Sequence, residues 1–273
     1  MCGPTTKTDD ATSVPYEKSE AFQLITYTEE ELEAMRKVKA ALMEEHGVEE
    51  SRIGLCFLAM NTINSKLRVE EATKKYKKLL DIMADCGVPE GIDDDLWKPE
   101  AAYQLYPYKP AGVDNNGLSV LWIKGGNKVP LDEERHHVQA ALMFFMAVHA
   151  DHKSLKNGIT FVIDSSQKPE GPKIGNEKKM QKIYQSFPLR PQAIRIAGAS
   201  GVMRVIINTT IKVASVFTKQ KILDRIQFVT IEDAKKAMPA HSVPKYVGGE
   251  GGGHSTIEEW VKGRLSLFTK PEL

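Results

Sequence analysis

The sequence has few cysteines, almost no net charge and no long apolar run. Its three cysteines form no CxxC pair, which argues against a disulfide framework and a zinc site, so we expect a reducing, cytoplasmic location. The 37 basic and 36 acidic side chains leave a formal charge of +1, so no nucleic-acid partner is expected. No run reaches the roughly 18 apolar residues of a membrane-spanning helix. Any membrane contact is therefore expected to be peripheral and transient.

The first third of the chain is predicted to be helical after a polar N-terminal arm. Residues 1–26 are polar and show no sustained period, which predicts a disordered arm. Thr28, followed three residues later by Glu31, has the spacing of a capping box at a helix start. Apolar residues then recur at helical spacing in three successive runs. We therefore expect a helical N-terminal lobe over 27–108.

The remainder of the chain alternates strand patterns with helical patterns. Short runs rich in β-branched and aromatic residues are separated by longer helical stretches, which predicts crossover connections and a mostly parallel sheet. The expected strands cover 118–123, 159–163, 193–197 and 226–229. The sequence therefore predicts an α/β lobe over 109–250, with a C-terminal tail over 251–273 that holds a short helix.

One predicted helix, residues 202–217, is unusually apolar. Only Arg204, Asn208, Lys212 and Ser215 supply a polar face. In an ordinary α/β protein this pattern is typical of a helix buried between the sheet and its neighbours. Downstream, Pro244 restricts one turn while Gly248 and Gly249 free the backbone at the next, so the helix is followed by a rigid corner with a flexible exit.

Five segments in this order resemble the CRAL-TRIO lipid-binding family, which includes carriers of tocopherol, retinaldehyde and phosphatidylinositol. They are GLSV at 117–120, GITFVID at 158–164, FP at 187–188, FTKQKILDRI at 217–226 and VPKYVGG at 243–249. The resemblance implies a sheet that floors an apolar cavity, a gate helix over 202–217 that swings outward at a membrane, and the corner as the cavity's closing edge. The expected lining residues are Val120, Trp122, Phe161, Ile163, Ile194, Ile196, Met203, Ile206, Ile207, Thr210, Ile211, Ala214 and Phe217.

The resemblance leaves the head group of the ligand open. Thr218 and Lys221 fall where phosphatidylinositol-binding members carry a threonine and a lysine that hold the inositol phosphate. Alternatively, Thr218 is only a helix N-cap and Lys221 a solvated surface charge. Leu189 and Ala59 stand where those members have a glutamate and an arginine, which weakens the assignment.

Around the gate, a basic rim is expected to dock on an anionic membrane, with a solvated helix face balanced by Asp224 as the alternative. Its members are Arg204, Lys212, Lys219 and Arg225. No catalytic or metal site is expected, because Ser200 lacks the final glycine of a nucleophile elbow and His136 and His137 lie on different helix faces. We therefore expect a monomeric protein without cofactors that binds a lipid and transfers or presents it at membranes. A lipid-sensing regulatory module and an α/β hydrolase are the alternatives.

Overall fold

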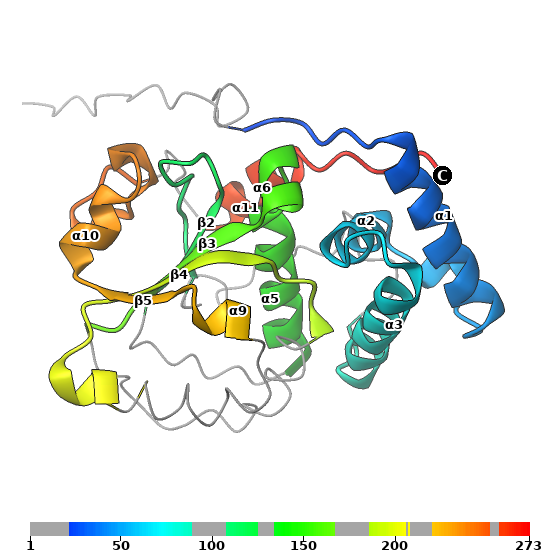
Figure 1. The fold of residues 1–273 in the computed structure, drawn as a ribbon, viewed down its shortest axis with the longest axis horizontal. Coiled ribbons are helices and arrows are strands. Elements are labelled where there is room, and N and C mark those ends of the chain that lie inside the picture. Colours follow the sequence, from blue (N-terminus) through cyan, green and yellow to red (C-terminus); the bar gives the residue numbers. More distant parts are fainter. Residues whose placement is uncertain are drawn as a thin grey trace, which may run out of the picture.

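The computed structural model describes residues 22–88, 108–124, 134–166, 186–205, 207, 220–251 and 257–273, with only the backbone described at 134–137, 140 and 221. Three helices form its N-terminal part: α1 (Glu29–Glu44), α2 (Leu55–Asn64) and α3 (Val69–Asp85), shown in Figure 1. A short 3₁₀ turn, η2 (Glu50–Arg52), precedes α2. The prediction of a helical N-terminal part is confirmed.

Local sequence explains where α1 begins and which side it buries. The Thr28 hydroxyl accepts a hydrogen bond from the Glu31 amide at 3.2 Å, and the Glu31 carboxylate accepts one from the Thr28 amide at 2.8 Å. The predicted capping box is therefore present, and it satisfies two amides that have no partner within the helix. Met35, Val38 and Leu42 lie on one side of α1 and are completely buried.

In the part of the chain that the structure describes, the sheet has five strands in the order β1-β2-β3-β4-β5. They are β1 (Tyr108–Lys109), β2 (Val120–Lys124), β3 (Ile159–Asp164), β4 (Pro191–Ala197) and β5 (Ile226–Val229). Among these described strands, only β1 pairs antiparallel, with β2, and the other neighbours pair in parallel. The α/β fold with a mostly parallel sheet is thus confirmed, and 226–229 is a strand at the expected residues.

Helices cover both faces of the sheet. Between β2 and β3, α5 (Glu134–Val148) is followed by the short helix α6 (His152–Asn157), whose start is capped by the Asp151 side chain. The short α9 (Gln220–Leu223) precedes β5, and α10 (Ile231–Lys236) follows it. Figure 1 shows α5 and α10 on opposite sides of the sheet, so we name these sides the α5 face and the α10 face.

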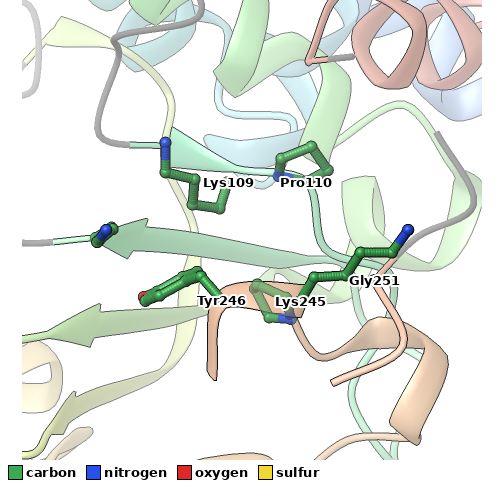
Figure 2. A pocket seen from close by; sticks show the side chains of 7 residues that line it. Lys109, Pro110, Lys245, Tyr246 and Gly251 are labelled. Atoms are coloured by element: carbon green, nitrogen blue, oxygen red, sulfur yellow. The ribbon is translucent and has the colours of Figure 1, made fainter. Parts of the chain in front are cut away.

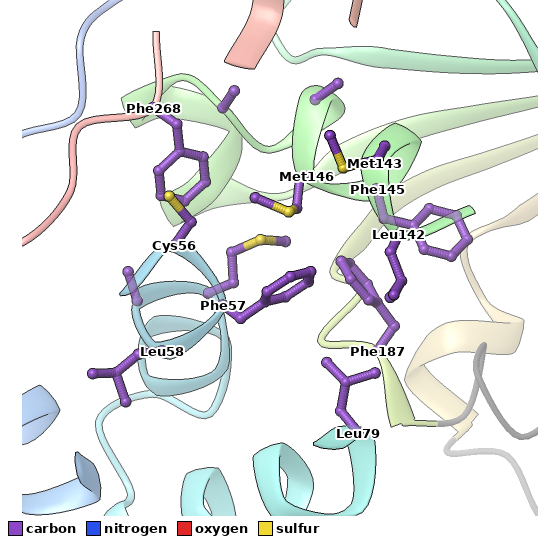
Figure 3. Close-up of a cluster of buried hydrophobic side chains, with 14 of the residues drawn as sticks. Cys56, Phe57, Leu58, Leu79, Leu142, Met143, Phe145, Met146, Phe187 and Phe268 are labelled. Carbon is purple, nitrogen blue, oxygen red and sulfur yellow. The ribbon is translucent and has the colours of Figure 1, made fainter. Parts of the chain in front are cut away.

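One apolar core joins the two expected lobes. Phe187, which precedes β4, contacts Phe57 of α2 with ring centroids 5.9 Å apart and Phe145 of α5 with ring centroids 4.8 Å apart (Figure 3). Asn64 of α2 also donates a hydrogen bond to the Pro188 carbonyl at 2.8 Å. The N-terminal helices are therefore packed directly against the sheet domain through shared side chains.

Both ends of the described chain take part in this core. Ile25 is only 2% exposed and Phe22 is partly buried against the same core, so these two residues, which we expected to belong to the disordered arm, are instead part of the core. At the other end, α11 (Ile257–Leu265) packs on α5, and Trp260 donates a hydrogen bond to the Ala111 carbonyl at 2.7 Å. Tyr27 donates to the Thr269 carbonyl at 2.7 Å, which ties the two ends together.

A buried ion pair holds α11 in place. The guanidinium of Arg264 lies 2.8 Å from the Asp151 carboxylate, and the two side chains are at most 1% exposed. Arg264 also donates to the Ala147 carbonyl at 3.0 Å. Burial by itself would raise the pKa of Asp151, but the Arg264 charge and the hydrogen bonds from Arg264 and Ser154 together lower it. The C-terminal segment is therefore anchored by a charge pair that water does not reach.

Candidate functional site

Strand register divides the six predicted sheet residues between two faces. Phe161 and Ile163 of β3 pair with Ile194 and Ile196 of β4, so these four share the α5 face. Val120 and Trp122 pair with Thr160 and Val162, which occupy alternate positions and point to the α10 face.

The prediction that all six residues line one surface is therefore corrected for Val120 and Trp122. Both are completely buried, and they pack in a separate core cluster with Ala234 of α10 and with Met238, which follows that helix. The physical reason is the two-residue period of a strand. On the α5 face, their places in β2 are taken by Leu121 and Ile123, which pair with Phe161 and Ile163.

The α5 face continues across β4 and β5 as an apolar strip. Ile226 and Phe228 of β5 pair with Ile194 and Ile196, and both extend the strip, although neither was predicted from the sequence to line it. Burial decreases across the sheet: Leu121 of β2 is 1% exposed, whereas Ile194, Ile226 and Phe228 are only half-buried. We name this strip the apolar floor: Phe161, Ile163, Ile194, Ile196, Ile226 and Phe228.

The expected gate helix begins close to the β4 end of this floor. Residues 201–205 and 207 are helical, and the Ser200 hydroxyl accepts a hydrogen bond from the Met203 amide at 3.3 Å. Val202 and Val205 are 73% and 66% exposed, whereas Met203 and Ile207 are half-buried. The described start of this helix therefore presents apolar side chains both to solvent and toward the protein.

The other predicted residues of the gate and the basic rim lie outside the described residues. These are Ile206, Thr210, Ile211, Lys212, Ala214, Phe217, Thr218 and Lys219. Lys221 is part of α9, but only its backbone is described. Their proposed contacts with a ligand or a membrane therefore stay predictions.

The two arginines of the predicted rim differ in their surroundings. Arg204 is exposed, with its guanidinium carbon 5.7 Å from the ring centroid of Phe228 in the apolar floor. Arg225 is half-buried and donates a hydrogen bond to the Pro191 carbonyl. Burial and the Arg225 charge lower the pKa of Arg190. Arg204 also donates a hydrogen bond to the Ala199 carbonyl at 3.2 Å, while Arg225 stabilises the junction between β4 and β5.

The proline and glycine corner packs against the other face of the sheet. It consists of two 3₁₀ turns, η3 (Ala240–Ser242) and η4 (Lys245–Val247), and Gly248 has a φ of +81° that favours glycine. A Cβ on Gly249 would lie 2.1 Å from the Val243 carbonyl oxygen, so the backbone approaches too closely for a side chain. Because Val243 belongs to the α10-face core, the expectation that this corner closes the cavity is wrong for the described residues.

The head-group positions that departed from the family pattern are apolar in the structure as well. Ala59 is completely buried within α2, and Leu189 is partly buried against the main core. No polar group for a ligand comes from these two side chains.

The CRAL/TRIO domain model matches residues 105–249, which include all five strands and the corner. The chain belongs to the CRAL/TRIO domain family. CRAL/TRIO domains bind lipids, and members of the family are generally lipid carriers rather than enzymes. No curated protein matches this chain. A solved structure described as "Crystal structure of Sfh5" is similar at 11% identity and a TM-score of 0.44, over 86% of this chain and 96% of that one.

Within the described ranges, no helix of this CRAL/TRIO protein is long and apolar enough to cross a membrane.

Proposed function

We propose that this CRAL/TRIO protein binds a hydrophobic ligand, such as a phospholipid, over the apolar floor and transfers or presents it at membranes. The observation that carries the proposal is the half-buried apolar surface of β4 and β5 beside a helix with exposed valines. An apolar strip of this kind, in a family of lipid-binding domains, suits an acyl chain better than a polar substrate. The proposal requires neither a cofactor nor a second copy of the chain.

The energetics of acyl chains explain why such a carrier needs a wall that opens. At about 0.8 kcal/mol per methylene, two tails with roughly 30 methylenes cost about 24 kcal/mol to hold in water. The carrier must therefore cover nearly all of the tails during transit. Because a bilayer covers the tails equally well, moving the lipid between protein and membrane changes the free energy little. The task of the protein is therefore to open only at the membrane surface.

The start of the gate helix is suited to contact that surface. Val202 and Val205 are three residues apart and hence lie on one side of the helix, with the exposed Arg204 between them in sequence. A cation near an anionic leaflet contributes about 1 kcal/mol, and the valines gain by leaving water. Thr218 and Lys221 stay candidates for holding a phosphorylated head group, with a neutral ligand as the alternative.

Native mass spectrometry of the purified full chain, followed by vesicle-to-vesicle transfer of fluorescent phosphatidylcholine, tests the proposal. A stoichiometric co-purified lipid and accelerated transfer are expected. A lipid that binds without transfer would favour the lipid-sensing alternative. A protein that emerges empty, and whose melting temperature no lipid extract shifts, would contradict lipid binding.

A further inference from the structure

A second candidate site lies on the α10 face, where β1 and β2 meet the corner. It is a pocket of about 320 Å³ lined by Lys109, Lys124 and Lys245, together with Tyr246, two prolines and a glycine. Figure 2 shows Lys109 on β1 and both Lys245 and Tyr246 on η4. Because alternate strand residues point to opposite faces, Lys124 lies on the same face as Trp122, away from the apolar floor.

Two hydrogen bonds hold one wall of the pocket in a fixed position. The Tyr246 hydroxyl accepts a hydrogen bond from the Trp122 indole at 2.6 Å and donates one to the Asp164 carboxylate at 2.6 Å. Both partners are buried, so the ring cannot turn away without leaving polar groups unsatisfied. Asp164 is 2% exposed and also accepts hydrogen bonds from Ser166, so its carboxylate is engaged inside the protein.

Positive charge is concentrated around this wall. The Lys124 ammonium lies 4.7 Å from the centroid of the Tyr246 ring. Lys109 is half-buried, and its burial together with the Lys124 charge lowers its pKa. Neither Lys124 nor Lys245 forms an ion pair with a described residue, and no described carboxylate lines the pocket. An anion in the pocket would therefore relieve repulsion between ammonium groups.

The backbone at Gly251 passes so close to the Lys245 side chain that only glycine fits there. Gly251 has a φ of +63°, and a Cβ added there would lie 2.6 Å from Cγ of Lys245. The Gly251 amide donates a hydrogen bond to the Val243 carbonyl at 2.9 Å, which keeps this approach in place. The stem of Lys245 is therefore bounded by backbone on one side, although the residue as a whole is exposed.

We propose that this pocket binds the phosphate group of a phosphate ester. Lysine ammonium groups are compact point charges that bind phosphate well, and a phosphate dianion is matched by several of them. The Tyr246 ring and the proline side chains supply an apolar wall for the organic part of the ester. The site lies on the opposite face from the apolar floor, so it goes beyond the lipid-binding function proposed above.

Isothermal titration of the full chain with inorganic pyrophosphate tests the soluble source of the phosphate, and sedimentation with vesicles containing phosphatidic acid tests the membrane source. The double variant Lys124→Gln/Lys245→Gln is expected to weaken binding at least tenfold with one probe or both. Lys124→Arg/Lys245→Arg, which keeps both charges, is expected to retain most of the binding. Lys236→Gln serves as a control, because this exposed lysine of α10 lies on the same lobe.

The probe that binds more weakly to the double variant than to wild type identifies the source of the phosphate. Weaker binding of pyrophosphate indicates a soluble ester, and weaker binding of the vesicles alone indicates a lipid head group. The proposal is overturned if wild type binds neither probe more tightly than the double variant, or if Lys236→Gln weakens binding equally. Transfer of neutral phosphatidylcholine is expected to be unchanged in the double variant, so failure of this site is distinguishable from failure of the lipid-binding function.

Discussion

Replacing Val202 and Val205 by serine is expected to weaken membrane binding about 30-fold. The two side chains are 73% and 66% exposed, and full burial of a valine contributes about 1.5 kcal/mol at the lower end of its range. Scaled by these exposures, the pair contributes roughly 2 kcal/mol at the bilayer, which corresponds to about 30-fold in affinity. Ser200, whose side chain accepts from the first helical turn, is unchanged, so the start of the helix is expected to form normally.

Sedimentation with phosphatidylcholine vesicles measures this effect directly. Leu24→Ser is the matched control, because Leu24 is also apolar and 63% exposed but lies in the extended segment before α1. The control is expected to bind vesicles like wild type. Equal loss in both variants would mean that general surface hydrophobicity drives binding. No loss in the valine variant would remove the start of the gate helix from the membrane contact.

Three further predictions concern the buried groups and the gate. Burial of His149 lowers its pKa from 6.5 to about 4, so the unfolded chain takes up a proton at a higher pH than the folded chain. The contribution of His149 to the free energy of unfolding is therefore fully present above pH 6.5 and falls by about 3 kcal/mol toward pH 4. In guanidinium unfolding across this pH range, the free energy of unfolding should depend less steeply on pH for His149→Asn than for wild type. The same pH dependence in both proteins would contradict a lowered pKa of His149. Arg264→Met leaves the Asp151 carboxylate buried without its ion-pair partner and should cost about 3–5 kcal/mol in the same assay, with a loss under about 1 kcal/mol as the contrary result. Ile207→Asp places a charge on a half-buried position of the gate and should abolish lipid retention while the melting temperature of the empty protein stays near wild type; unchanged retention would exclude Ile207 from the site.

Sequence patterns predicted the three N-terminal helices and the strands β2 to β5 because these elements carry local signals, whereas β1, α9 and α10 were not predicted. The capping pair at Thr28 and Glu31 marks the start of α1, and the run at 226–229 is a strand at those residues. The short helix α6 was not predicted, although Asp151 is a good N-cap residue at its start. Local chemistry therefore accounts for element type better than for element ends.

The sequence does not predict which side chains of β2 point to which face of the sheet. Val120, Leu121, Trp122 and Ile123 are all apolar, and a strand buried on both faces shows no alternation that would separate them. The role of Arg264 was equally hidden, because its partner Asp151 lies 113 residues away in the chain. The basic pocket depends on residues from β1, β2 and η4, and only the folded chain brings them together.

The most direct test of the central proposal is native mass spectrometry of the full chain purified under non-denaturing conditions. The proposal predicts an added mass that matches one lipid per protein, which is lost in Ile207→Asp and retained in Val202→Ser/Val205→Ser. A wild-type protein that carries no lipid, and takes up none after incubation with phosphatidylcholine vesicles, would contradict the proposal that the apolar floor is a lipid-binding surface.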